Sequence, residues 1–360
     1  MIVNTKLVVL VLGWITGIIV TAFCRHAAAD DDVHNTYERN FHRSVDYNDH
    51  HHGHIHLGSV ESSQLRSRAL VNDVFNTTLS MSSSSHCATI DPSPGVMAES
   101  IRNTQKWITS PNFRQGTTID VSTYFHIVSA DVNYFTGENE TVGIITDADV
   151  TNQLQVLNDA FRPYGFTFTL KGTTRNNNTE WYYFYDDEMK SALRVGDAST
   201  LNVYFTAAFG VYGYGAWPWD YEQSPKNDGV VVNSLAIPDG PYLDRNEGKT
   251  LVHEVGHWLG LLHTFQFKRT SPVSAHYVNE NSIFYILRHC LLNDDLIGDT
   301  PKQKSPTNGC PARRNSCSFY RGSDPIHNYM DYSDDTCRNE FTSGQVDRMK
   351  AMWNEYRAAA

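Results

Sequence analysis

The feature that most constrains this chain is a single segment, TLVHEVGHWLGLLHTF, at residues 250–265. It places His253 and His257 four residues apart, about 400° of rotation on a helix, so both imidazoles project from nearly the same line. Gly260 can adopt the left-handed conformation that ends a helix, which lets His263 approach the same point from another direction. Three imidazoles with a fourth position left open are the donor set of a catalytic zinc.

Glu254 comes directly after the first of these imidazoles. Its carboxylate can reach a water molecule in the open position without binding the metal, so we predict that Glu254 is the general base. H-E-x-x-H alone occurs by chance in unrelated helices, but its extension by x-x-G-x-x-H is much more specific. The competing interpretation, a helix with three buried structural histidines, requires every motif residue to be placed by accident. We predict one catalytic Zn²⁺ and no other cofactor-binding residues.

The net charge argues against one class of partner, and the N-terminus indicates export from the cell. A formal net charge of −11 over 360 residues argues against nucleic acid as a partner. Lys6, the apolar run at 7–23 and the small residues after it are typical of a signal peptide, which we place at 1–24. We expect a secreted, extracellular protein without stable membrane association. An uncleaved membrane anchor is the alternative, because the run is near the lower length limit for spanning a bilayer.

Cysteines and sequons agree with export. Four cysteines cluster near the C-terminus: Cys290, Cys310, Cys317 and Cys337. Clustered cysteines in an exported chain indicate disulfides, but the sequence leaves three pairings open. The candidate glycosylation sites are Asn76, Asn139 and Asn177.

Residues 25–116 differ in composition from the rest of the chain. They are rich in histidine, serine and acidic residues, and we interpret them as a largely low-complexity pro-segment. The histidine-rich tract at 50–56 is either flexible, solvated sequence or a metal scavenger. Residues 117–360 have the patterns of one folded catalytic domain. Apolar alternation there predicts strands at 118–128, 166–172, 201–209 and 229–237, and helical spacing predicts helices at 147–162, 249–259 and 343–357.

Beyond the zinc helix, several segments resemble the metzincins, and within them the pappalysin branch that includes secreted fungal metalloproteases. They are LNDAFRPYGFTFTLKGT, MKSALRVGDASTLNVYF, DGVVV, SDPIHNYMDYSDDTC and FTSGQVDRM, and they extend the resemblance over most of residues 117–360. The resemblance implies an α+β, metzincin-like fold: a twisted mixed sheet with the active-site helix, plus a small disulfide-tied C-terminal subdomain. It also implies a zinc endopeptidase that acts on proteins or peptides.

The resemblance assigns further residues. NYMDY at 328–332 matches the methionine turn beneath the metal, which makes Met330 a structural residue and not a ligand. Tyr332 matches a tyrosine that sits near the metal in several branches, where its hydroxyl can stabilise the oxyanion of the tetrahedral intermediate, although an ordinary packed tyrosine is an equal alternative. His327 matches no ligand position, and we interpret it as structural. His126 lies on the first predicted strand, on the face opposite Phe125, and we interpret it as an ordinary strand residue and not a ligand.

The resemblance also implies disulfides Cys290–Cys317 and Cys310–Cys337. Cys87 is then left free, where its thiolate can bind the zinc of a zymogen as a cysteine switch, although CATIDPSP differs from the C-G-T pattern of such segments. Residues 268–289 have no counterpart in the family and are either a surface loop or translated intron sequence.

We expect a monomer with protein or peptide substrates. Whether calcium binds does not follow from the sequence. The alternative function is a catalytically inactive secreted metal-binding or interaction protein, against which the intact Glu254 counts. A zinc hydrolase of non-peptide esters or amides shares the metal chemistry but does not account for the pappalysin-like segments.

Overall fold

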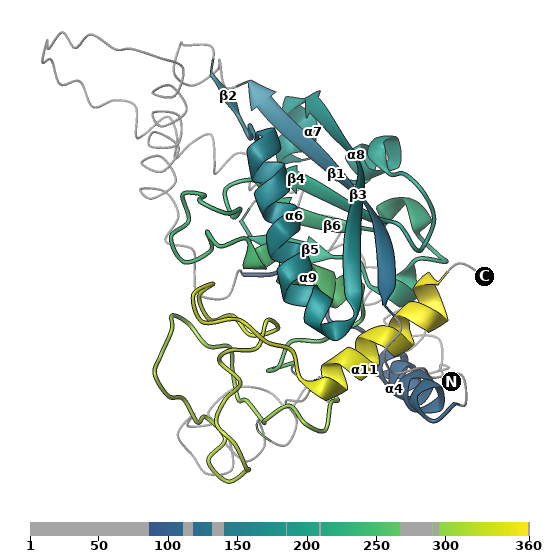
Figure 1. Cartoon of the computed structure of the whole chain (residues 1–360), viewed down its shortest axis with the longest axis vertical. Coiled ribbons are helices and arrows are strands. Elements are labelled where there is room, and N and C mark those ends of the chain that lie inside the picture. Colours follow the sequence, from purple (N-terminus) through teal and green to yellow (C-terminus); the bar gives the residue numbers. More distant parts are fainter. Residues whose placement is uncertain are drawn as a thin grey trace, which may run out of the picture. The chain divides into compact units, whose positions relative to one another are not determined.

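The structure is a computed structural model that describes residues 86–110, 118–131, 140–184, 186–208, 210–266, 290 and 295–358 (Figure 1). All of these lie in one compact unit, Met81–Ala360. The signal peptide, the histidine-rich tract and the 268–289 segment lie outside the described residues. None of the helices in the described part is long and apolar enough to cross a membrane.

A mixed sheet forms the centre of this unit. Its main strands, in order across the sheet, are β3 (Phe166–Asn177), β1 (Ile119–Asp131), β4 (Leu201–Thr206), β6 (Val230–Asn233) and β5 (Gly213–Gly215). The first four are parallel to one another, and β5 runs antiparallel to β6 along the edge. A short strand, β2 (Thr141–Val142), pairs with the end of β1.

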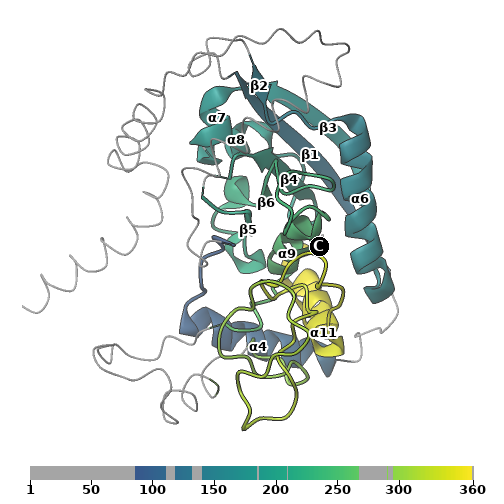
Figure 2. The same cartoon turned by 90° about the vertical axis from the view of Figure 1, so that its left-hand side faces the viewer.

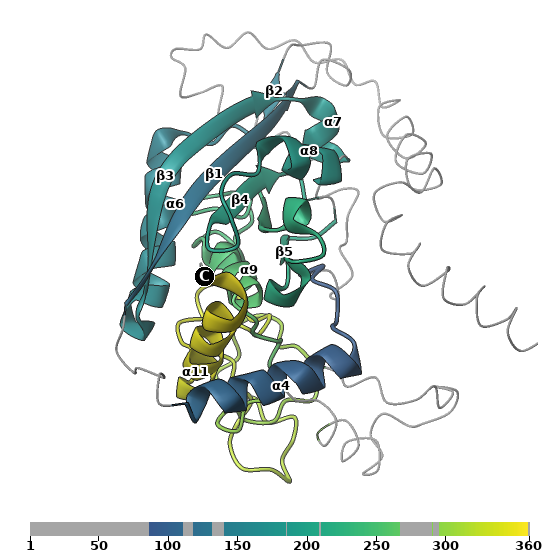
Figure 3. The same ribbon diagram turned by 90° about the vertical axis from the view of Figure 1, so that its right-hand side faces the viewer.

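Helices cover both faces of the sheet. One face carries α6 (Asp147–Phe161) and α9 (Lys249–Trp258), and the other carries α7 (Thr179–Tyr183) and α8 (Asp186–Leu193), as Figures 2 and 3 show. The remaining helical elements are α4 (Pro94–Ile108), α11 (Ser343–Met352), the 3₁₀ turns Arg162–Tyr164, Pro218–Asp220 and Pro225–Asn227, and the π-helical turn Trp353–Arg357. Helix α4 packs against α11, side by side with it in Figure 3.

Local sequence explains the long helix on the sheet. Thr146 and Asp149 form a reciprocal capping box at the start of α6, which satisfies two backbone donors that the helix itself leaves unpaired. Leu157 and Phe161 then face the core, where Phe161 packs edge-on against Phe168 with ring centroids 5.3 Å apart. The apolar face of helix α6 and the alternating apolar residues of the strands thus pack in one core.

Every strand and helix predicted from the sequence is confirmed, with shifts of a few residues at the ends. Strand β5 and the helices α4, α7 and α8 were not predicted from the sequence. His126 is a buried strand residue, whose ring nitrogens lie 2.9 Å from Thr174 Oγ1 and 3.0 Å from Asn202 Oδ1. The neighbouring Phe125 points to the opposite face of the sheet and packs in the core beneath α6 and α9, because successive residues of a strand alternate between the two faces.

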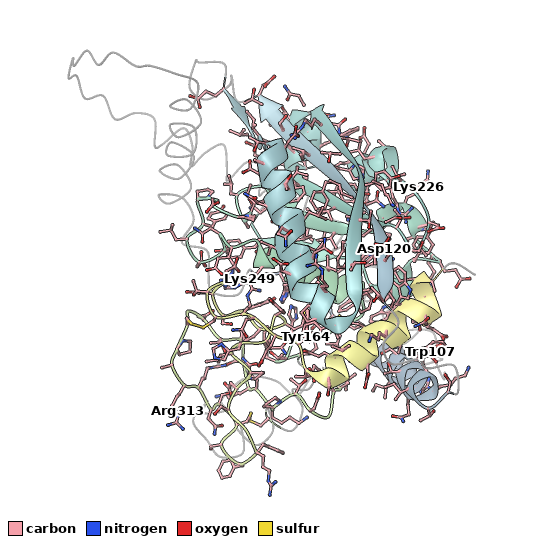
Figure 4. All side chains as sticks on the ribbon, in the orientation of Figure 1. Trp107, Asp120, Tyr164, Lys226, Lys249 and Arg313 are labelled. Atoms are coloured by element: carbon pink, nitrogen blue, oxygen red, sulfur yellow. A yellow bond between two sulfur atoms is a disulfide. The ribbon has the colours of Figure 1, made fainter. Side chains whose placement is uncertain are left out.

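The C-terminal part of the chain is irregular before α11 and is tied to the start of α9. Cys290 is joined to Cys317 and Cys310 to Cys337, the two pairs that the family resemblance implied. Asp335 Oδ2 accepts the backbone N–H groups of Glu247 and Lys249, at 3.0 and 3.2 Å. The Lys249 ammonium donates to the Asp335 carbonyl at 2.6 Å, and Figure 4 labels Lys249 beside the C-terminal chain.

Met330 lies against the middle of α9 and is fully buried. A Cβ atom on Gly256 would lie 2.4 Å from the Met330 sulfur. Glycine is therefore required at 256 by the close approach of the methionine turn to the helix, and not by backbone conformation.

We predict that Gly256→Ala lowers the free energy of unfolding by about 1–3 kcal/mol, because the added methyl overpacks this contact. Gly298→Ala is the matched control, since a Cβ there meets no atom within 4 Å. Denaturant unfolding of both variants measures the difference, and equal stability would contradict the contact.

Candidate metal centre

The three motif histidines converge on one point inside the molecule. His257 Nε2 lies 3.2 Å from His253 Nε2 and 3.1 Å from His263 Nε2. Nitrogens bound to a tetrahedral zinc about 2.1 Å away must lie about 3.4 Å from one another, so this spacing suits such an ion. All three side chains are at most 6% exposed. Their three buried lone pairs have no hydrogen-bond donor to share at this point, whereas a cation can bind all three.

The other ring nitrogen of each histidine fixes the direction of its ring. His253 Nδ1 lies 2.7 Å from the Tyr329 carbonyl oxygen and His257 Nδ1 lies 2.8 Å from that of Leu261. His263 Nδ1 lies 3.2 Å from the Gln266 side-chain oxygen, a partner that was not predicted from the sequence. Each Nδ1 donates its proton to these acceptors and leaves Nε2 free for a metal.

Burial keeps the imidazoles uncharged. It is the largest cause that lowers the pKa of His257 to about 4 and the pKa values of His253 and His263 well below the ordinary value. The His257 charge contributes next to the lowered pKa of the other two rings. Neutral imidazole is the form that binds zinc.

The turn after α9 brings His263 back to the helix. Gly260 has a φ of +87° and donates its N–H to the His257 carbonyl at 2.8 Å, which ends the helix as the sequence predicted. A Cβ on Gly260 would lie 2.5 Å from Met352 Cγ, so α11 also closes over this turn.

Glu254 is buried beside the histidines. Its Oε2 accepts from the Cys87 thiol and from the Thr89 hydroxyl, each at 3.3 Å. Burial is the main cause that raises its pKa to about 8. Strand β5 approaches closely because it is glycine-rich: a Cβ on Gly213 would lie 2.9 Å from Glu254 Cγ, and one on Gly215 would lie 2.7 Å from the Glu254 carbonyl oxygen.

Cys87 completes the cluster. Its sulfur and the three imidazoles offer ligand atoms that all lie within 4.8 Å of one another, and it forms no disulfide. Burial first, and then the Glu254 charge, raise the pKa of the Cys87 thiol well above its ordinary value. A cation at the histidine nitrogens reverses this preference, because a coordinating thiol is deprotonated.

The chain around Cys87 lies along the edge strand. The Ala88 N–H donates to the Gly213 carbonyl at 3.1 Å, and the Gly215 N–H donates to Thr89 Oγ1 at 2.9 Å. Further along, the Trp217 indole donates to the Ile90 carbonyl at 2.6 Å. The segment therefore covers the strand edge next to the histidines.

Tyr332 lies beside the same cluster and is 7% exposed. Its ring centroid is 5.0 Å from that of His263 and 5.7 Å from that of His253. Burial first, then Cys87 and Glu254, raise the pKa of the Tyr332 hydroxyl well above its ordinary value. The hydroxyl stays protonated and can donate a hydrogen bond.

The other candidate residues lie away from the cluster. His327 Nδ1 lies 2.8 Å from the Cys337 carbonyl oxygen, so it has a structural partner. Asn177 is exposed at the end of β3, and its amide donates to Asp131 at 2.9 Å. Asn76 and Asn139 lie outside the described residues.

The chain is similar in sequence to a known family of proteins. The family model described as Pregnancy-associated plasma protein-A matches residues 200–354. An extracellular metalloprotease of Colletotrichum graminicola is 41% identical over 67% of this chain and 78% of its own length. Extracellular metalloprotease 1 of Coccidioides posadasii is 39% identical over 67% of this chain and 79% of its own.

Two solved structures have the same fold. Mature mirolysin of Tannerella forsythia, in complex with a cleaved peptide, aligns with a TM-score of 0.51 at 24% identity, over 68% of this chain and 100% of that one. A promirolysin mutant of the same organism aligns with a TM-score of 0.56 at 24% identity, over 76% and 94%. These likenesses confirm the α+β, metzincin-like fold with a disulfide-tied C-terminal part.

We predict that Gln266→Leu weakens zinc binding about 10–100-fold, because His263 loses the acceptor that orients its ring. Gln155→Leu is the matched control, since Gln155 lies on the exposed face of α6 and bonds to Asp159. Competition with a chromogenic chelator measures both affinities. Equal affinities would show that Gln266 does not support the ligand.

Proposed function

We propose a mechanism and a location for this chain from the premise that it belongs to the pappalysin-like family of extracellular metalloproteases and is a zinc metalloendopeptidase. The observation that carries the mechanism is the convergence of three buried imidazoles beside one buried carboxylate. The proposed ligands are His253, His257 and His263, and the proposed general base is Glu254. When bound, zinc supplies Lewis-acid chemistry that polarises the scissile carbonyl and acidifies water.

Glu254 takes a proton from the attacking water and later passes it to the leaving amine. Its position supports both steps, because the carboxylate lies next to the histidines and against the edge strand at Gly213. Burial raises its proton affinity, which suits a group that must accept and then return a proton. The nucleophile is water, so no acyl-enzyme forms.

The substrate lies extended along β5. This edge already pairs with residues 87–89 of the same chain through backbone and threonine hydrogen bonds, so it can hold a peptide by strand addition. Tyr332 donates its hydroxyl proton to the oxyanion of the tetrahedral intermediate, a role that its protonated state and its contact with His263 support. Met330 packs against the middle of α9 and supports the helix that carries two of the proposed ligands.

We further propose that the mature enzyme acts outside the cell on proteins or peptides. The two disulfides and the signal-like N-terminus support export, as do the relatives named extracellular metalloproteases. The exposed side chain of Asn177 is accessible to a glycan.

We predict that Glu254→Ala retains zinc and loses nearly all peptidase activity, because it removes the proton acceptor but no metal ligand. His253→Ala, His257→Ala and His263→Ala each lose both zinc and activity, since each removes a ligand. Zinc analysis and peptide hydrolysis separate the two outcomes. An active Glu254→Ala enzyme contradicts the mechanism, and a wild type that binds zinc without cleaving any peptide supports the inactive metal-binding alternative.

The segment before residue 117 restrains the enzyme until it is removed. Cys87 supplies the fourth ligand in the precursor, in the place that water must occupy, and the contacts of residues 88–90 with the edge strand exclude substrate. Cleavage between Cys87 and Thr117 frees that ligand.

We predict that the unprocessed wild type is silent while unprocessed Cys87→Ser cleaves peptide, because a serine hydroxyl is a much poorer ligand for zinc than a thiolate. Activity is measured before any processing is detectable by mass. A fully active wild-type precursor refutes the restraint. Two silent precursors show that the cover of the edge strand suffices and that Cys87 is not the agent.

A further inference from the structure

The chain between His257 and His263 forms the turn that brings the third imidazole back to the first two. We call residues 258–262 the ligand turn, because a displacement of this turn moves the two imidazoles relative to each other. Helix α9 ends here, and the last carbonyl groups of a helix have no partner within the helix itself. The carbonyls of the ligand turn therefore need donors from elsewhere.

Two of these carbonyls accept from arginine side chains near the C-terminus. Arg348, on α11, donates its Nε–H to the Gly260 carbonyl at 2.7 Å. Arg357, at the end of the π-helical turn that follows α11, donates its Nε–H to the Trp258 carbonyl at 3.1 Å. Two guanidinium groups from one end of the chain thus hold the ligand turn at two points.

A third carbonyl links the ligand turn directly to one of the imidazoles. The Leu261 carbonyl accepts the Nδ1–H of His257 at 2.8 Å, and Leu261 directly follows Gly260. The bond from Arg348 therefore lies one peptide unit away from the bond that orients the His257 ring. A shift of the turn at Gly260 changes the direction of this ring as well as the position of His263.

Arg357 holds the residue that directly follows His257. Its guanidinium carbon lies 3.8 Å from the Trp258 ring centroid, in addition to the bond to the Trp258 carbonyl. Its Nη1 lies 2.9 Å from Asp228 Oδ1, which also accepts the Trp258 indole N–H at 3.1 Å. Trp258 is thereby fixed at its backbone, its ring face and its indole nitrogen.

Both arginines are buried, which is a costly position for a cation. Arg357 is 0% exposed and Arg348 is 2% exposed, and burial lowers the pKa of Arg348 to about 10. Well-packed apolar side chains in place of buried charges are often as stable, so stability alone is a weak reason for two such cations. A guanidinium group offers several donors in fixed directions, which an apolar side chain does not.

We propose that Arg348 and Arg357 are positioning residues of the metal site. They fix the ligand turn, so that His257 and His263 lie at metal-binding distance before the ion arrives. Residues 343–357 then contribute to zinc affinity although they supply no ligand. This inference rests on the proposed zinc ligands.

The first test measures zinc affinity in the full chain, with Glu254→Ala present in every sample to prevent self-cleavage. Arg348→Lys and Arg357→Lys keep the positive charge, but an ammonium group does not reproduce the directions of the guanidinium donors. Competition with a chromogenic chelator should show zinc affinity about 10–100-fold lower in each variant. The visible spectrum of the cobalt-substituted protein should change as well, because it reports the arrangement of ligands around the ion.

Met189→Ala is the matched control for a loss of stability. Met189 is fully buried on α8, on the face of the sheet opposite to α9, so its truncation destabilises the fold away from the ligand turn. Its zinc affinity and cobalt spectrum should equal those of the parent chain. Arginine variants that lose stability but keep both properties overturn the proposal, since the arginines then act on the fold alone.

Hydrogen exchange of the parent chain gives a second test, which holds even where the arginine variants fail to fold. Without zinc, residues 343–357 should exchange faster than with zinc, because a loosened ligand turn releases both arginines. Helix α8 should change much less. An equal change in both regions, or no change in residues 343–357, contradicts the coupling.

The zinc content of the parent chain separates the two ways to fail. A parent chain that binds no zinc contradicts the proposed ligands, and this inference with them. A parent chain that binds zinc, beside arginine variants of equal affinity, contradicts the positioning role alone.

Discussion

The structure depends on the burial of three neutral imidazoles that aim one lone pair each at a single point. Such a cluster is unfavourable without a cation, because each nitrogen is removed from water and gains no donor in exchange. It is also rigid, since Tyr329, Leu261 and Gln266 hold the opposite ring nitrogens. The fold around it supplies what an ion needs: a helix for two ligands, a glycine turn for the third, and a methionine against the helix.

The same constraint explains the two glycines of the edge strand, Gly213 and Gly215. Strand β5 must approach Glu254 closely enough for a bound peptide to meet the carboxylate, and only glycines at 213 and 215 leave room. An edge strand of this kind attracts other strands. In this chain the residues from His86 to Ile90 cover it, and they place a thiol at the histidines.

The zinc helix and the main sheet could be predicted because their signals are contiguous: ligands at helical spacing, and apolar alternation along β1. Strand β5 could not, because three residues, two of them glycine, are too few to show an apolar alternation. Helix α4 was missed because polar contacts hold it as well as apolar ones, with Ser100 accepting from Arg348 and Asn103 donating to Tyr356.

The most direct test of the zinc site is X-ray absorption at the zinc edge, on the unprocessed chain and on the processed enzyme. We expect three nitrogen ligands and one sulfur at about 2.3 Å in the unprocessed chain, and three nitrogens with an oxygen after processing. Sulfur in neither form, with three nitrogens in both, would remove Cys87 from the metal. Fewer than three nitrogens in the processed enzyme would contradict the central claim that His253, His257 and His263 together hold the zinc.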